Sequence, residues 1–422
     1  MVPFDKKAPK WALFLMPRAS TAWKGSEALW ITVAGWATAA KQLWPYTVVV
    51  TTDRVSDPAA VRDYPLESPC SPLTNRQPPA RIPFAKIVPA LVVTLLKDVL
   101  QWRRSKRAYR NLPELPSDPP AFVWEQHDIF PGPGSRLATQ HYGVPLITYV
   151  HAPQVWEAAK WGVRRPLWGR WIERYIEAPA LRRANVVACV SEGVADKLVE
   201  LGVASENILV SPMAVDPKVF DRKEAAHALR NEYDLVGKIV IGWVGSFRSF
   251  HGLEDLIEVF DQVHRELPQT ILLLVGDGIE RQKIEKLVAT KQLLHAVRFT
   301  GRQKFSQVPS FISLFDIAIV SAKSAQGFHY SPLKLREYLA AGKATLAPRA
   351  GEIPTVFTHG ENVLLYSIGN IAETARVMKE LVVDEGKRDR LGNSGREFIL
   401  DHGTWMVELR KVLDRLPAKT SA

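Results

Sequence analysis

Short, wholly apolar runs recur along this chain of 422 residues and alternate with stretches of helical spacing. Such runs are typical of parallel strands whose two faces are both covered by the intervening helices. Strands are expected at 11–16, 46–51, 121–125, 144–150, 186–190, 208–211, 239–244, 270–275, 297–301, 315–320 and 344–347. The alternation predicts an α/β protein with two doubly wound domains, residues 1–212 and 213–403.

The composition bears on the compartment in which the chain folds. Hydrophobic residues make up 46% of the chain and charged residues 23%, as in ordinary globular domains. The two cysteines, Cys70 and Cys189, support neither a disulfide framework nor a metal site and fit a reducing compartment. No apolar stretch is long enough for a signal peptide or for the roughly 18 residues that cross a bilayer. A cytoplasmic location is therefore expected.

The whole chain has a net charge of +11 and 13 tryptophans, and both the excess of positive charge and the tryptophans are concentrated in its first half. Residues 81–110 contain eight basic residues against the single acid Asp98, and residues 156–174 combine four tryptophans with five basic residues. Such a combination is attracted to anionic membrane surfaces, so membrane contact is one interpretation. A solvated basic helix beside a tryptophan-rich cleft is the other. No nucleic-acid-binding module is recognisable, so no nucleic-acid partner is expected.

The clearest candidate site follows the apolar run 315–320. Ser331 has the character of an N-cap, Pro332 of a first helical residue, and Gly342 of a left-handed helix end. The pattern predicts a strand, a loop and a helix whose free N–H groups bind an anion.

Two charged residues of this helix sharpen the hypothesis. Lys334 lies in the first turn, where a cation opposes the helix dipole by about 0.3–1 kcal/mol unless it serves to hold a phosphate. Glu337 lies on the same face and can accept both hydroxyls of a ribose diol. We infer a nucleotide-sugar diphosphate site. The alternative is an ordinary surface pair at i,i+3 spacing.

The stretch from Ser331 to Lys343 resembles the donor-site signature of the retaining glycosyltransferases of family 4. The resemblance implies the GT-B fold: two Rossmann-like domains face each other across a cleft, and a last helix at about 404–417 packs back on the first. It places the donor on residues 213–403 and the acceptor on 1–212, and it adds Leu333 and Leu335 to the donor contacts.

The sequence departs from the family pattern at two places. His329 stands where many members have a second Glu, eight residues before Glu337, and this puts a hexose contact in doubt. Met213 and Ala214 stand where related enzymes usually have an Asn-Gly pair.

Further candidate donor contacts follow other strands. Gly245 and Ser246 let backbone approach a phosphate, and Arg248 can neutralise the diphosphate with help from His251. Gly276 follows the next strand, and Gly25 lies in the first strand-to-helix turn. The alternative for Arg248 is a solvated loop arginine, and the alternative for Gly25 and Gly276 is an ordinary tight turn without a ligand.

In the first domain, His151 ends the strand 144–150, where side chains of open α/β sheets point toward the ligand. The spacing from Trp124 to Glu157 also resembles family 4. His151 is therefore the candidate acceptor-side group, with His127 and Asp128 as a second choice. A structural histidine is the alternative.

The sequence thus predicts a retaining enzyme that moves a hexosyl group from a nucleoside diphosphate sugar to a hydroxyl acceptor, with His151, Arg248, Lys334 and Glu337 as its catalytic residues. No Asp-x-Asp motif stands at a strand end, so neither a metal nor another cofactor is expected. The basic, tryptophan-rich first domain suggests a lipid-linked or envelope-glycan acceptor and a role in polysaccharide biosynthesis. A GT-B-fold nucleotide-sugar epimerase and a non-catalytic nucleotide-sugar-binding protein remain alternatives.

Overall fold

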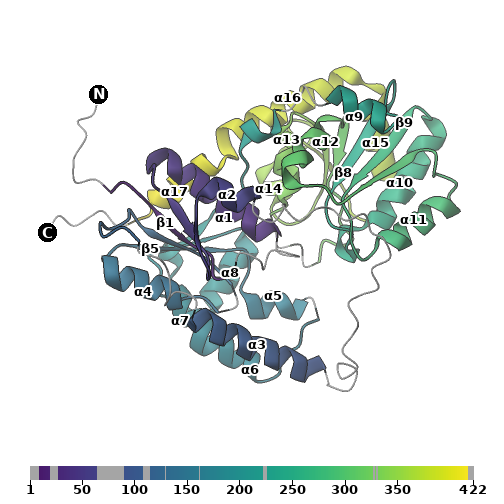
Figure 1. Ribbon diagram of the computed structural model, residues 1–422. Helices are drawn as coiled ribbons and strands as arrows, with labels where there is room; N and C mark the ends of the chain where they lie inside the picture. The colour runs from purple at the N-terminus through teal and green to yellow at the C-terminus, as the bar shows by residue number, and fades with distance from the viewer. Residues whose placement is uncertain are drawn as a thin grey trace, which may run out of the picture. The chain divides into compact units, whose positions relative to one another are not determined.

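Two parallel sheets, each flanked by helices, organise the chain in the computed structural model (Figure 1). The structure describes residues 9–19, 27–63, 90–107, 115–128, 130–160, 162–221, 226–326, 328 and 331–416. The chain divides into two compact units, Met1–Pro212 with Glu408–Ala422, and Met213–Val407.

The first unit contains a seven-stranded sheet of order β3-β2-β1-β4-β5-β6-β7, in which only the β2–β3 pair is antiparallel. Its strands are β1 (Leu13–Leu15), β2 (Val48–Val50), β3 (Val55–Ser56), β4 (Val123–Gln126), β5 (Leu146–Val150), β6 (Val186–Cys189) and β7 (Ile208–Val210). Its helices are α1 (Glu27–Leu43), α2 (Pro58–Asp63), α3 (Ala90–Arg107), α4 (Pro133–Tyr142), α5 (Gln154–Lys160), α6 (Trp168–Ile172), α7 (Ala178–Leu181) and α8 (Glu192–Glu200). A π-helical turn (Glu173–Glu177) joins α6 to α7, and a 3₁₀ turn (Ser205–Asn207) precedes β7.

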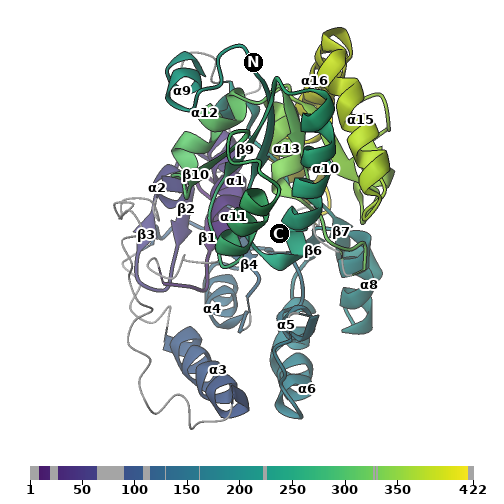
Figure 2. The ribbon, with the colours of Figure 1, turned by 90° about the vertical axis from the view of Figure 1, so that its right-hand side faces the viewer.

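The second unit contains a six-stranded, wholly parallel sheet of order β10-β9-β8-β11-β12-β13 (Figure 2). Its strands are β8 (Ile239–Val244), β9 (Thr270–Val275), β10 (Val297–Gly301), β11 (Ile317–Ile319), β12 (Ala344–Pro348) and β13 (Leu364–Tyr366). Its helices are α9 (Ala226–Glu232), α10 (Leu253–Glu266), α11 (Arg281–Thr290), α12 (Val308–Ser313), α13 (Leu333–Ala340), α14 (Ile353–Val356), α15 (Ile371–Val383) and α16 (Glu385–His402). Short 3₁₀ turns lie at Pro217–Phe220, Ser249–His251 and Phe305–Gln307. Helix α17 (Trp405–Leu413) follows, and its residues from Glu408 onward belong to the first unit.

Every strand expected from the apolar runs is present, and β8, β9 and β10 have the expected bounds. Residues 55–82 are rich in Pro, Asp, Arg and Ser, which predicts an exposed connection, but β3 and α2 lie within this range. Residues 64–82 are outside the described residues. Strand β13 was not expected. Its three residues are too few to show a period in the sequence.

Tryptophans form much of the core of the first unit, at positions outside the range 156–174 for which membrane contact and a tryptophan-rich cleft are the two interpretations. Trp30, Trp36 and Trp124 are fully buried, and the ring centroids of Trp36 and Trp124 are 4.7 Å apart. Trp36 also meets Tyr149 edge-on at 5.1 Å. Within the part of the chain that is described, no helix combines the length and apolar character that crossing a bilayer requires.

Candidate functional site

The strand order of the second sheet reverses between β8 and β11, which are neighbours in the sheet but far apart in the sequence. In doubly wound sheets, ligands bind beyond the carboxyl ends of the strands at such a reversal. Gly245 directly follows β8, and α13 is the helix that follows β11. The topology therefore brings two predicted donor segments, far apart in the sequence, to one edge of the sheet.

The Lys334 ammonium lies at the centre of this arrangement. Its Nζ is 4.2 Å from the ring centroid of Trp243, and a Cβ added to Gly245 would lie only 2.7 Å from it. This Nζ is buried and, among the described residues, has no hydrogen-bond partner. A cation–π contact compensates only part of the cost of burying a charge. The site therefore favours an anion that would complete the ammonium's hydrogen bonds.

Glu337 lies on the same helix and is only 6% exposed. Burial lowers the pKa of Lys334 to about 7, an effect that Glu337 partly offsets. Burial likewise raises the pKa of Glu337 to about 7 against the opposing effect of Lys334. The alternative interpretation, in which Lys334 and Glu337 form an ordinary ion pair on the surface, is excluded because both groups are buried. A bound phosphate would raise the pKa of Lys334 and favour its charged form.

Glycine allows two turns to pack against each other at the strand ends. The N–H of Gly245 donates to the carbonyl of Val275 at 2.9 Å, and that of Gly276 to the carbonyl of Gly301 at 3.0 Å. Gly276 has φ 138°, and a Cβ there would lie 1.9 Å from the carbonyl oxygen of Gly245. A side chain at Gly276 would collide with the Gly245 carbonyl, so glycine is required for the two turns to pack this closely.

Ser246, Arg248 and His251 lie on the loop that follows Gly245. Ser246 is half-buried and the Arg248 residue is exposed. Burial holds the pKa of His251 well below its usual value, and the charges of Lys334 and Arg248 lower it further. His251 is therefore neutral at pH 7 and can donate or accept a hydrogen bond there. Any positive charge from this loop comes from Arg248.

The start of α13 differs from the expectation. The helix begins at Leu333, and Pro332 rather than Ser331 occupies the N-cap position. The Ser331 hydroxyl accepts from the Met213 N–H at 3.2 Å and from Arg336 Nη1 at 2.6 Å. The predicted N-cap is wrong because Arg336, itself only 3% exposed, takes the hydroxyl that would have capped the helix.

The end of α13 is as expected. Gly342 has φ 68°, its N–H donates to the carbonyl of Leu339, and the Lys343 N–H donates to the carbonyl of Tyr338. This pair of bonds is a Schellman motif. One turn after Lys334, the Tyr338 hydroxyl accepts from the Val244 N–H at 2.7 Å and so ties the helix to the end of β8.

Four further residues were predicted to contact the donor: Leu333, Leu335, Gly25 and His329. Leu333 is half-buried, whereas the Leu335 side chain is fully buried in the core of the second unit. Only the backbone of Leu335 could therefore reach a ligand. Gly25 and His329 lie outside the described residues.

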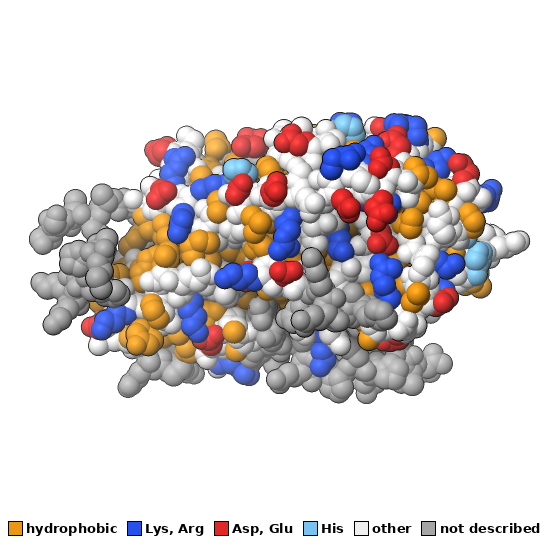
Figure 3. Space-filling view, turned by 90° about the horizontal axis from the view of Figure 1, so that it is seen from above, with side chains coloured by type: hydrophobic (Ala, Val, Ile, Leu, Met, Phe, Trp, Pro, Cys, Tyr) orange, Lys and Arg blue, Asp and Glu red, His pale blue; other side chains and the backbone are white. Residues whose placement is uncertain are grey.

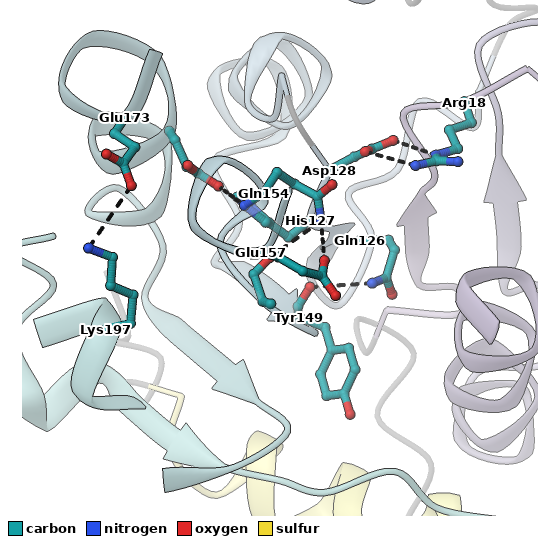
Figure 4. Close-up of polar contacts among 11 residues, drawn as sticks. Arg18, Gln126, His127, Asp128, Tyr149, Gln154, Glu157, Glu173 and Lys197 are labelled. Atoms are coloured by element: carbon teal, nitrogen blue, oxygen red, sulfur yellow. Dashed lines mark hydrogen bonds and ion pairs between the residues drawn. The ribbon is translucent and has the colours of Figure 1, made fainter. Parts of the chain in front are cut away.

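In the first unit, polar side chains gather where β1, β4 and β5 end. Arg18 follows β1 and points toward Asp128, which follows β4 (Figure 4). The Arg18 guanidinium donates from Nε at 2.5 Å and from Nη2 at 3.1 Å to the Asp128 carboxylate. This pair spans the point where the strand order of the first sheet reverses, between β1 and β4.

A buried carboxylate lies next to His127, one of the two predicted histidines. Glu177 Oε1 is 2.8 Å from His127 Nε2 and accepts the Gln154 N–H at 2.6 Å. The Glu177 and His127 side chains have no exposed surface. Glu177 thus joins the end of β4 to the first residue of α5.

His151 lies beyond β5 and meets the ring of Tyr149 edge-on at a centroid distance of 5.4 Å. Its Nε2 is buried and has no hydrogen-bond partner within the described part of the chain. Burial, assisted by the charge of His127, lowers the pKa of His151 to about 4. A neutral imidazole with a free ring nitrogen can accept or donate a hydrogen bond to a ligand hydroxyl.

Sequence reasoning missed Trp243, Tyr338 and Glu177. Trp243 and Tyr338 looked like core residues, and the sequence gives no signal that they contact residues about a hundred positions away. The apolar spacing over residues 172–184 predicts a regular helix that carries Glu177. A π turn, which inserts an extra residue into the helical repeat, places it instead.

Two family models match the chain. The model described as Glycosyltransferase Family 4 matches residues 46–219, and the model described as Glycosyl transferases group 1 matches residues 227–398. Together they cover most of both units.

Relatives of established or assigned activity align with part of the chain. The N-acetyl-alpha-D-glucosaminyl L-malate synthase of Bacillus anthracis is 27% identical over 224 residues, 52% of this chain and 56% of that protein. The 2-deoxystreptamine glucosyltransferase of Streptomyces kanamyceticus is 30% identical over 233 residues, 54% of this chain and 58% of that protein. The chain spans about half the length of the curated relatives it matches.

Solved structures show the same fold over nearly the whole chain. Anabaena Alr3699/HepE in complex with UDP and glucose has a TM-score of 0.64 at 15% identity, covering 96% of this chain and 99% of that one. Sucrose-phosphate synthase from Thermosynechococcus elongatus has a TM-score of 0.62 at 18% identity, covering 96% and 98%.

Proposed function

Because the chain belongs to glycosyltransferase family 4 and has the GT-B fold, we propose that it transfers a hexosyl group from a nucleoside diphosphate sugar to a hydroxyl acceptor. We propose further that the anomeric configuration of the sugar is retained. Retention follows from the resemblance of residues 331–343 to retaining family members.

The observation that carries this proposal is the unpartnered Lys334 ammonium. It is buried at the start of α13, beside glycine backbone and near the Glu337 carboxylate. A diphosphate supplies the anion that this arrangement favours, and the ribose of a nucleotide supplies a diol for Glu337. The similar structure of Anabaena Alr3699/HepE contains UDP and glucose.

In the proposed reaction, the bond from the anomeric carbon to the diphosphate breaks and negative charge develops on the leaving phosphate. Lys334, Arg248 and the first N–H groups of α13 would stabilise this charge. Lys334 and the N–H groups of α13 are held by the fold before the reaction, so they need little reorganisation. These cations would serve in place of a divalent metal. His151 would orient the sugar or the acceptor hydroxyl from the first unit.

For the acceptor, we propose a lipid-linked or envelope glycan, reached at a membrane surface. The basic residues of the first half support this, as do two relatives by their names: the colanic acid biosynthesis glycosyl transferase WcaI of Escherichia coli and the lipopolysaccharide core biosynthesis glycosyltransferase LpsE of Rhizobium meliloti.

A thermal-shift panel of UDP-, GDP- and ADP-sugars tests the donor site. A ligand at 100 times its dissociation constant adds about 2.7 kcal/mol to the free energy of unfolding, so binding is easily seen. We expect one base to be preferred and Glu337→Ala to abolish the shift. Glu361→Ala, at an exposed site in the same unit, is the control and should keep it. If no nucleotide sugar stabilises the protein, or if Glu337→Ala binds like wild type, the proposal is wrong.

A further inference from the structure

Helix α3 exposes its apolar side chains. Two rows at i,i+4 spacing run along it, 91–95–99 and 92–96–100, and all six residues are large and apolar. They are Leu91, Val92, Leu95, Leu96, Val99 and Leu100, with exposed fractions from 37% to 55%. An amphipathic helix of a globular protein normally turns such a face to the core, so this face lacks a partner within the described structure.

A buried polar anchor fixes the rotation of α3. Asp98 is 6% exposed and accepts from Arg165 Nε at 2.8 Å, Arg165 Nη2 at 3.1 Å and Trp168 Nε1 at 3.0 Å. Trp102, one turn on, packs against the small cluster around Ile172. Turning the apolar rows inward would break the Asp98–Arg165 pair and leave a charge unpaired.

The segment that anchors α3 also exposes large apolar side chains. These are Leu167, Trp171 and Tyr175, at 91%, 50% and 59%. The rings of Trp171 and Tyr175 are 5.9 Å apart, and the Arg174 guanidinium lies 5.6 Å from the Tyr175 ring. Aromatic rings next to arginine are typical of the water–lipid boundary.

The charges of α3 indicate which partner would cover its apolar face. Along the helix, five basic residues (Lys97, Arg103, Arg104, Lys106 and Arg107) accompany one acid, Asp98, which is already neutralised by Arg165. Lys97 and Arg103 are exposed. On the face of the molecule drawn in Figure 3, by contrast, acidic and basic side chains are intermixed. An apolar helix face accompanied by positive charge is complementary to a lipid surface that has an apolar interior and anionic headgroups.

We propose that α3 is a membrane-docking helix that lies in the headgroup region of bilayers containing anionic lipid. Figures 1 and 2 show α3 at the periphery of the first unit, beyond α4. The apolar rows would insert below the headgroups, and Lys97 and Arg103 would contact lipid phosphates. This proposal does not depend on the sugar-nucleotide site of the second unit.

Vesicle co-sedimentation of the full chain tests the proposal. Vesicles of phosphatidylcholine alone are compared with vesicles that contain equal amounts of phosphatidylcholine and phosphatidylglycerol. We expect binding only to the anionic vesicles. The variant Leu96→Glu with Leu100→Glu, and separately Lys97→Glu with Arg103→Glu, should weaken that binding at least tenfold.

Two matched controls keep the test specific. Lys286→Glu with Arg390→Glu makes the same charge change at exposed sites of the second unit, and Leu400→Glu replaces an exposed leucine on α16. Both should bind vesicles like wild type. Thermal unfolding followed by circular dichroism, with a midpoint within a few degrees of wild type, shows that each variant is folded, whether or not a nucleotide sugar binds.

Three outcomes would overturn the proposal. The first is wild-type protein that ignores anionic vesicles, and the second is a Leu96→Glu, Leu100→Glu variant that binds them fully. The third is wild-type protein that is a dimer by light scattering and becomes a monomer in that variant, because a second copy of the chain would then cover the face.

Discussion

At the scale of single residues, the proposed donor site depends on two buried groups whose pKa values are shifted from opposite directions to the same value. The pKa of Lys334 is lowered to about 7 and that of Glu337 is raised to about 7, in both cases mainly by burial. Phosphate binding needs the protonated ammonium, and the ribose diol needs the ionised carboxylate. The free protein therefore holds the fully charged pair in only part of its population.

This coupling predicts a bell-shaped pH dependence of nucleotide-sugar affinity, with a maximum near pH 7. Below it Glu337 gains a proton, and above it Lys334 loses one. The diphosphate of the ligand, which is esterified at both ends, does not titrate in this range. Calorimetric titration across the pH range measures the profile. Lys334→Arg should flatten the alkaline limb, because arginine stays protonated, and Glu337→Gln should flatten the acid limb.

The control for the pH profile is Glu361→Gln, which should leave both limbs unchanged because Glu361 is exposed and lies outside the site. A wild-type affinity that stays constant through pH 7 would show that these two groups do not hold the ligand.

At the scale of elements, the sequence predicted regular structure well and its local irregularities poorly. Strands β8 and β9 could be delimited because each is a largely apolar run bounded by polar residues or glycine, and β10, which contains Arg298 and Thr300, ends at Gly301. The start of α13 was misplaced by one residue, since the hydroxyl of Ser331 has two competing partners, and one of them, Met213, is over a hundred residues away. Local spacing carries no information about such a partner.

The π turn at 173–177 was unpredictable for a related reason. The apolar spacing over 172–184 fits a continuous helix, and the turn is stabilised by what its last residue contacts. Glu177 meets His127 and the Gln154 N–H, which lie on separate elements. The candidate site of the first unit could therefore be located from the strand ends, whereas its buried carboxylate could not.

The π turn gives a prediction about stability. Glu177→Ala would leave the His127 ring nitrogen and the Gln154 N–H buried without an acceptor, which should lower the free energy of unfolding by about 2–4 kcal/mol. Glu177→Gln keeps an oxygen at the position of Oε1 and should cost less than half as much. Urea denaturation monitored by circular dichroism measures both.

The matched control is Glu200→Ala on α8, since Glu200 is 68% exposed and its pair with Lys197 should contribute under about 1 kcal/mol. Equal losses for the Ala and Gln variants at position 177 would mean that the shape of the side chain matters there and its hydrogen bonds do not.

At the scale of the whole molecule, the chain forms the first unit from both of its ends and the second unit from the segment between them. The first unit is completed by residues from the end of the chain, where Glu408 accepts a hydrogen bond from Ser211 at 2.7 Å. Leu409 and Val412 are fully buried and are absent from the core of the second unit. The predicted last helix at about 404–417 corresponds to α17, whose final residues belong to the first unit.

This arrangement predicts that a substitution near the C-terminus weakens the first unit. Leu409→Ala should lower its free energy of unfolding by about 2–5 kcal/mol through lost burial and the cavity left behind. A nucleotide sugar bound to the second unit should stabilise that unit alone. Differential scanning calorimetry should therefore show two transitions, of which Leu409→Ala lowers one and the ligand raises the other. Leu400→Ala, at a half-exposed site on α16, should move neither by more than a degree or so. If Leu409→Ala lowers the transition that the ligand raises, α17 stabilises the donor-binding unit, and the assignment of its last residues to the first unit is wrong.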